Sequence, residues 1–132
     1  MPRLPRVVGL VLCDRMEIDV QNGQMSLVGV FQSSAFLSFP TAEQTFTVYC
    51  ALWGGSGEGT MEFVITHLPT ERDIYRHRRW RALPGAGQVM NLEIKVRRCI
   101  YPAPGRYAAS LRFDNRELTL RYFDVFLRRS GP

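Results

Sequence analysis

The sequence predicts an all-β fold, and specifically an antiparallel β-sandwich of about eight strands of the immunoglobulin-like or jelly-roll-like kind. Apolar and polar residues alternate with a period of two along much of the chain, which is the spacing of half-buried strands. Turn-forming Gly, Pro, Asn and Asp interrupt these runs at short intervals, and no segment shows a clear helical period. A chain of 132 residues with 45% apolar content can bury a core, so we expect a single domain over residues 1–132.

The clearest pattern is a hairpin over residues 104–120. One face of its first strand is apolar and consists of Tyr107, Ala109, Leu111 and Phe113. Asp114-Asn115 follows as the turn, because both residue types tolerate positive φ. Beyond the turn the apolar parity changes between Leu120 and Phe123, which predicts a bulge near Arg121-Tyr122.

The N-terminal third predicts one strand and one hairpin. Residues 7–14 have apolar side chains on both parities, which is typical of a strand covered on both faces. The turn signal at residues 21–24 joins residues 16–20 to residues 25–31 as a hairpin. Residues 36–40 then read as a crossing loop.

The middle of the chain predicts a second hairpin and one further strand. Residues 45–53 and 60–67 alternate regularly on either side of the Gly-rich segment 54–59, so we expect them to pair as a hairpin. Their apolar faces are formed by Phe46, Val48, Cys50 and Leu52 in the first strand and by Met61, Phe63 and Ile65 in the second. Regularity weakens from residue 68 to residue 87, where we expect only a short edge strand at residues 73–76. A regular strand follows at residues 89–97, with Met90, Leu92, Ile94 and Val96 facing inward.

Several of these segments together resemble a known family. They are Leu12-Cys13-Asp14, Ser26-Leu27-Val28-Gly29-Val30-Phe31, Gly57-Glu58-Gly59, and Pro104-Gly105-Arg106-Tyr107 with Phe113-Asp114. Taken in that order, they are similar to a family of small uncharacterised bacterial β-sandwich proteins. The resemblance implies a fold and a bacterial origin, and it implies no activity. The Gly105-x-Tyr107 element also resembles the tyrosine corner of immunoglobulin-like sandwiches, in which the hydroxyl reaches back to upstream backbone.

The cysteines and the hydropathy predict a cytoplasmic location. No apolar stretch reaches the roughly 18 residues that span a bilayer, and the N-terminus is charged too early for a signal peptide, so no membrane contact is expected. An odd count of three scattered cysteines, Cys13, Cys50 and Cys99, is unlike the framework of a secreted protein. We interpret them as buried free thiols, and a Cys50–Cys99 bridge stays open as the alternative.

Charge is concentrated in one segment. The formal net charge is +5, but only Lys95 of the cationic residues is a lysine, as codon bias in a GC-rich genome produces, so placement matters more than number. The densest cluster lies within residues 71–81, and its candidate binding residues are Arg72, Arg76, Arg78, Arg79, Trp80 and Arg81. Guanidinium groups beside aromatic faces suit a nucleic acid or another polyanion, or an acidic protein partner. A solvated edge strand protected by arginine explains the same pattern.

No catalytic, metal or cofactor site is predicted. His67 and His77 are the only histidines and have no Cys or second His at ligand spacing. Asp14, Glu17 and Asp19 lack the surrounding oxygen ligands of a calcium loop, so we interpret them as solvated strand ends. The chain also lacks a Gly-x-Ser-x-Gly elbow and a carboxylate pair that would indicate glycoside chemistry.

The sequence therefore predicts a non-catalytic module for protein binding or assembly. Apolar residues on both faces of residues 7–13 and 25–31 suggest a homo-oligomer in which a copy of the chain buries one sheet face. The main alternative is nucleic-acid or polyanion binding through residues 72–81. A weaker alternative is a carbohydrate or small-ligand site that uses Trp53 and Trp80 as stacking faces.

Overall fold

The computed structural model describes residues 3–129 and contains ten strands and no helix within that range. The strands are β1 (Arg6–Cys13), β2 (Arg15–Ile18), β3 (Met25–Val28), β4 (Ser33–Phe36), β5 (Gln44–Trp53), β6 (Glu58–His67), β7 (Arg72–Ala82), β8 (Val89–Cys99), β9 (Gly105–Phe113) and β10 (Arg116–Leu127). The all-β class is confirmed. The predicted count of about eight strands is wrong, because residues 33–36, expected to lie between strands and in a crossing loop, form β4.

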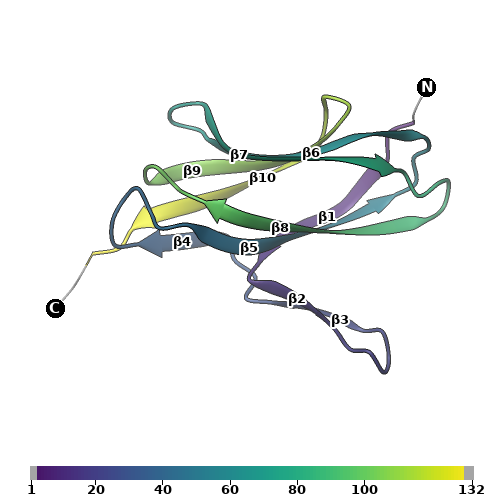
Figure 1. Ribbon diagram of the computed structural model, residues 1–132, viewed down its shortest axis with the longest axis horizontal. Helices are drawn as coiled ribbons and strands as arrows, with labels where there is room; N and C mark the ends of the chain where they lie inside the picture. Colours follow the sequence, from purple (N-terminus) through teal and green to yellow (C-terminus); the bar gives the residue numbers. More distant parts are fainter. Residues whose placement is uncertain (1–2, 130–132) are drawn as a thin grey trace.

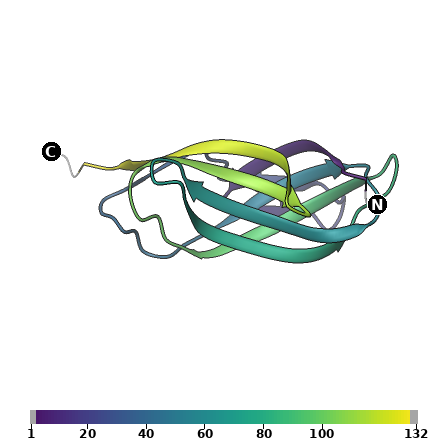
Figure 2. The same ribbon diagram turned by 90° about the horizontal axis from the view of Figure 1, so that it is seen from above.

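The strands form three sheets (Figures 1 and 2). The larger sheet has the order β4-β10-β9-β6-β7, the smaller sheet has the order β1-β5-β8, and β2 and β3 form a separate hairpin. The expectation of purely antiparallel pairing is wrong at one position, since β4 runs parallel to β10. The chain between β1 and β4 is long and includes the β2–β3 hairpin, so β4 can join the sheet in either direction.

One apolar core lies between the five-stranded and the three-stranded sheet. The predicted inward parities of β5, β6, β8 and β9 are confirmed, because their alternate side chains belong to one buried cluster that includes Val48, Leu52, Phe63, Ile65, Leu92, Val96, Tyr107 and Leu111. The Asp114-Asn115 turn is confirmed too, with φ values of 48° and 67°. Because these apolar residues face inward, the polar residues that alternate with them along each strand face outward.

The predicted pairing of residues 45–53 with 60–67 is wrong. β5 pairs with β1 and β8, whereas β6 pairs with β7 and β9 in the other sheet. The Gly-rich segment is therefore a connection between sheets. Its glycines at 54, 55 and 57 all have positive φ, which lets the chain change direction there.

Two bulges correct the parity arguments. In β1 the register shifts between Val7 and Gly9, so Val8 is an extra residue and its side chain is 67% exposed. The bulge accounts for the exposed Val8, whereas the end of the strand is covered on both faces as predicted, because the adjacent side chains of Leu12 and Cys13 are both buried. In β10 the register shifts between Glu117 and Thr119, not near Arg121-Tyr122. Leu118, at this shift, packs against the core, whereas Leu120 is on the same outward face as Tyr122 and is 39% exposed.

The Cys50–Cys99 alternative is wrong. All three cysteines are free and buried. Cys50 lies opposite Leu92, so Cys99 is seven residues further along β8, or about 20 Å at the usual rise of a strand. A disulfide requires α-carbons within about 7 Å of each other.

The two sheets are bridged along one side and open along the other. On the bridged side, the Arg121 Nη1 of β10 donates to the Leu10 carbonyl of β1 at 3.1 Å, and the Phe31 N–H donates to the Leu12 carbonyl at 3.0 Å. On the opposite side, β7 and β8 are the last strands of their sheets and do not pair with each other. Both therefore have an unpaired edge on the same side of the protein.

Candidate functional site

Strand alternation divides the arginine-rich segment between two surfaces. Residues 72–82 form the long edge strand β7, not the short one expected at residues 73–76. Arg79 pairs with the buried Met61 of β6, and Arg78 pairs with Glu62, so neighbouring arginines point to opposite faces of the sheet. Tyr75, His77, Arg79 and Arg81 face the side of β8, whereas Arg76, Arg78 and Trp80 face away from it.

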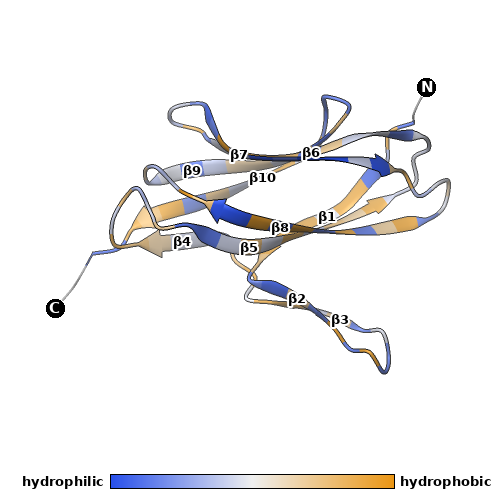
Figure 3. Ribbon diagram, viewed as in Figure 1, coloured by the Kyte–Doolittle hydropathy of each residue, from blue (hydrophilic) through white to orange (hydrophobic). Residues whose placement is uncertain are grey.

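A groove of about 480 Å³ lies between the open edges of β7 and β8. Met61 and Phe63 of β6, together with Leu92 and Ile94 of β8, form its apolar floor. Its walls and rim are polar and consist of Tyr75, His77, Arg79, Arg81, Glu93, Lys95 and Arg97. In Figure 3, β7 and the end of β8 are correspondingly hydrophilic. The groove is therefore an apolar slot between two charged strands.

The groove carries excess positive charge. Arg79, Arg81, Lys95 and Arg97 are cationic at neutral pH, and Glu93 is the one carboxylate among the residues that line the groove. Glu93 is 4.0 Å from Lys95, a loose ion pair. Lys95 and Arg97 were not among the binding residues predicted from the sequence. The predicted strand at residues 89–97 has both residues on its outward face, but nothing in the sequence indicated that β8 lies beside β7.

Tyr75 joins the two strands at one end of the groove. Burial raises the pKa of Tyr75, while a hydrogen bond with the Arg97 backbone acts in the opposite direction and lowers that pKa. The hydroxyl of a β7 residue thus reaches the backbone of β8. Its ring also packs edge-on against Phe63, with centroids 6.3 Å apart.

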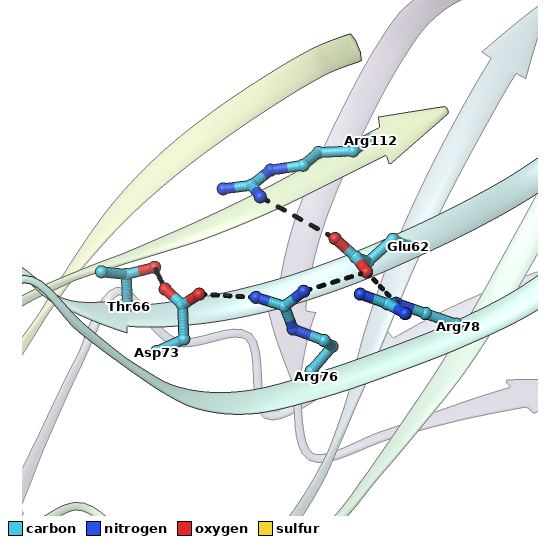
Figure 4. A network of polar contacts seen from close by, with 6 residues as sticks. All are labelled: Glu62, Thr66, Asp73, Arg76, Arg78 and Arg112. Carbon is cyan, nitrogen blue, oxygen red and sulfur yellow. Dashed lines mark hydrogen bonds and ion pairs between the residues drawn. The ribbon is translucent and has the colours of Figure 1, made fainter. Parts of the chain in front are cut away.

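The outward-facing arginines surround a buried carboxylate (Figure 4). Glu62 is only 5% exposed. Its Oε2 accepts from the Nε of Arg78 and from the Nη1 of Arg76 at 3.4 Å, and its Oε1 lies 3.8 Å from the Nη1 of Arg112 on β9. A carboxylate in this position is tolerated because three guanidinium groups compensate its lost hydration.

A second carboxylate extends this network. Asp73 accepts from the Thr66 hydroxyl at 2.7 Å and from the Nη2 of Arg76 at 2.7 Å (Figure 4). The hydrogen bond from Thr66, and then the bond and charge of Arg76, lower the pKa of Asp73. The charges of Arg76 and Arg78 are therefore largely balanced within the protein. Trp80 lies on this same face and is 64% exposed, while Arg72 lies at the exposed start of β7.

The segments that carried the family resemblance meet in the structure as close backbone contacts. A Cβ at Gly59 would lie 2.6 Å from the carboxylate of Asp114, and a Cβ at Gly29 would lie 2.8 Å from the Cβ of Asp14. The Tyr107 hydroxyl donates to the Ala103 carbonyl at 2.5 Å, so the predicted tyrosine corner is confirmed. These segments hold the fold together and do not converge on the groove.

The histidines have separate environments. His67 is buried, and its Nδ1 lies 2.7 Å from the Thr70 hydroxyl while its Nε2 lies 3.1 Å from the Pro104 carbonyl. His77 lines the groove. Over residues 3–129, no group of three or more His, Cys, Asp and Glu side chains is arranged to hold a metal ion. The same residues include no helix with the length and apolar character to cross a membrane.

Comparison with known proteins identifies the family but no activity. No curated protein matches the chain. Among solved structures, the chain is similar to a β-glucosidase from Kluyveromyces marxianus, with 10% sequence identity and a TM-score of 0.39. That similarity covers 89% of this chain and 14% of the β-glucosidase chain. A model of a protein family of unknown function matches residues 9–126, nearly the whole chain. The chain therefore belongs to this family of unknown function, DUF6941.

Proposed function

We propose that the chain is a non-catalytic protein-binding module that takes an extended acidic segment of a partner protein into the groove between β7 and β8. The observation that carries this proposal is the pair of open sheet edges that flank an apolar floor under a cationic rim. Open edges offer unpaired backbone N–H and C=O groups to an added strand. Such a strand would place apolar side chains on the floor and acidic side chains at the rim.

Strand alternation in the partner suits this groove. An added strand presents successive side chains to opposite faces, so an alternating acidic and apolar segment matches a groove that is apolar below and basic above. Phe63 and Leu92 would contact the apolar row, and Arg79 and Lys95 would contact the acidic row. Backbone pairing supplies affinity, while the two rows supply specificity.

A nucleic-acid surface is less well supported. Stacking of bases requires aromatic faces next to cationic groups. Trp80 lies on the opposite face of β7 from Arg79 and Arg81, and its neighbours Arg76 and Arg78 are engaged by Glu62. The segment that looks continuous in the sequence is thus divided, and of the aromatic rings that remain beside Arg79 and Arg81, that of Tyr75 packs against Phe63. This arrangement favours an acidic protein segment over a nucleic acid.

The nucleophile candidates also support a role in binding rather than catalysis. Burial raises the pKa of Cys50 and of Cys99 to about 12, so neither thiol supplies a thiolate at neutral pH. The two ring nitrogens of His67 are occupied by Thr70 and Pro104. Free thiols are typical of a reducing compartment, so we place the module in the cytoplasm.

The test is fluorescence polarisation with a labelled peptide of alternating Glu and Val. Saturable binding that weakens with salt is expected, and a peptide of alternating Lys and Val is expected not to bind. The groove variant Arg79→Glu/Arg97→Glu should weaken binding by at least about tenfold. The matched control Arg116→Glu/Arg128→Glu changes the net charge equally at exposed positions outside the groove and should bind normally.

Two outcomes would overturn the proposal. One is equal loss of peptide binding in the groove variant and in the matched control, which would show that only net charge matters. The other is tighter binding of a single-stranded oligonucleotide of similar length, with a steep dependence on salt, which would assign the surface to nucleic acid.

A further inference from the structure

Building on the proposed function, we infer that the occupant of the groove is the β2–β3 hairpin of a second copy of the chain. The copies then associate head to tail, with the hairpin of one inserted between β7 and β8 of the next. The inference rests on the exposure, the charge and the position of the hairpin.

The hairpin projects from the body of the protein (Figure 1). Its strands pair only with each other, and its cross-strand pairs Met16–Leu27 and Ile18–Met25 share one face. Towards the tip this face is uncovered, with Ile18 60% and Met25 38% exposed, and Val20 in the turn is 95% exposed. Figure 3 shows hydrophobic and hydrophilic segments alternating out to the tip.

A hairpin of this kind lacks sufficient contacts of its own to be stable in water. An isolated pair of strands is marginally stable in water and normally needs a third strand or a packed face. Towards its tip this hairpin has neither a third strand nor a packed apolar face, and both of its outer strand edges are unpaired. Insertion between β7 and β8 would supply a pairing edge and an apolar floor together.

The charges of the hairpin and the groove are complementary. Residues 14–28 contain three carboxylates, those of Asp14, Glu17 and Asp19, against the single guanidinium of Arg15. The groove presents four cationic side chains against one carboxylate. The carboxylates alternate with apolar Ile18 and Val20, which is the pattern that the groove is proposed to accept.

The hairpin cannot fill the groove of its own chain. It leaves the body after β1, and β1 and β8 are the opposite edges of the three-stranded sheet. The two contact surfaces are therefore different and far apart on one molecule. Such a heterologous contact builds rings or open chains rather than a closed two-fold dimer.

The size of the hairpin is suited to the groove. Each hairpin strand has four residues, or roughly 13 Å of length, and the edges of β7 and β8 are each 11 residues long. A volume of about 480 Å³ accommodates the few side chains of one hairpin face rather than a folded domain. The contact is thus a strand-addition contact of limited area, and we expect association to depend on concentration.

The experiment is sedimentation velocity on the full chain over about a hundredfold range of concentration. The unmodified protein should form species larger than a dimer as its concentration rises. The hairpin variant Ile18→Arg/Val20→Arg changes exposed side chains, so its fold should persist. That variant and the groove variant Arg79→Glu/Arg97→Glu should each remain monomeric alone. Mixed in equal amounts, they should form a heterodimer and nothing larger, because one intact hairpin meets one intact groove.

The outcomes separate the two proposals. A monomeric unmodified protein at every concentration, or a hairpin variant that associates normally, would overturn this inference. If the Glu-Val peptide still binds the groove in that case, the proposed function stands and the partner is another protein. If the peptide also fails to bind, both proposals are wrong. Displacement of self-association by the peptide would support the groove as the shared site.

Discussion

Asp114 and Gly59 lie in direct contact, so that the turn between β9 and β10 packs against the start of β6. The Oδ1 of Asp114 accepts the backbone N–H of Thr60 at 2.8 Å, and the Asp114 N–H donates to the Thr60 carbonyl at 3.0 Å. A Cβ at residue 59 would lie 2.6 Å from the Asp114 carboxylate and equally close to the Phe113 ring. Only glycine permits this approach.

Gly59→Ala is expected to lower the free energy of unfolding by about 2–4 kcal/mol, because the added methyl group meets the Asp114 carboxylate and a buried ring. The matched control is Gly9→Ala, where a Cβ has no atom within 4 Å and φ is not in the positive range. That control should change stability by about 0.5 kcal/mol or less. Urea denaturation measures both, and equal stabilities would contradict the contact.

Tyr107→Phe is expected to cost about 1–2 kcal/mol of stability, since it leaves the Ala103 carbonyl without its hydroxyl donor while keeping the buried ring. Tyr122 is 52% exposed, so Tyr122→Phe is the control and should be nearly neutral. Thermal unfolding of the two variants compares them directly. A neutral Tyr107→Phe would show that the tyrosine corner contributes no stability.

Glu62→Gln is expected to destabilise the protein by about 1–2 kcal/mol, because Arg76, Arg78 and Arg112 then repel one another around a neutral group and their partial exposure moderates the effect. Added salt should recover part of that loss by screening. Glu117→Gln, at an exposed position opposite Arg112, serves as the control. Denaturation at low and high salt distinguishes charge compensation from packing.

Asp73 should contribute to the acid dependence of stability. Its pKa is lowered in the folded protein by Thr66 and Arg76, so the folded state favours the carboxylate more than the unfolded state does. The contribution is complete above the unfolded pKa of about 4 and is lost as the pH falls through the folded value. Asp73→Asn should therefore flatten the acid side of the stability profile and leave its slope near neutral pH unchanged.

The three thiols should be unreactive in the native protein. Burial raises the pKa of Cys50 and of Cys99 to about 12 and raises that of Cys13. A thiol-specific chromophoric reagent should therefore label none of them at neutral pH and all three after unfolding in guanidinium. Release of fewer than three equivalents from the unfolded protein would indicate a disulfide.

The sequence was sufficient for features that depend on local patterns. Alternation gave the inner faces of β5, β6, β8 and β9, and the Asp-Asn turn and the tyrosine corner were located from short motifs. These features depend on neighbouring residues along one strand. The family resemblance likewise relied on short segments, and the contacts of Gly59 and Gly29 give the reason: each has no room for a side chain.

The sequence was not sufficient for relationships between distant strands. Residues 45–53 and 60–67 were expected to pair, but a loop that crosses between sheets and a loop that closes a hairpin have the same Gly-rich composition. The exposure of Val8 could not be predicted either, since the bulge adds one residue and reverses the parity at the start of β1. The groove could not be predicted from the sequence, because it exists only where β7 and β8, from different sheets, come to lie on the same side.

The alternation of side chains along β7 constrains the number of residues in this strand as well as their identity. Arg79 belongs to the groove and Arg78 to the Glu62 network only because of their parity. Insertion or deletion of a single residue upstream within this strand would exchange the two sets, moving Trp80 into the groove and exposing Arg79 on the opposite face. Among relatives of this chain, the substitution of one arginine by another should therefore be tolerated more readily than any change in the spacing between Asp73 and Arg81.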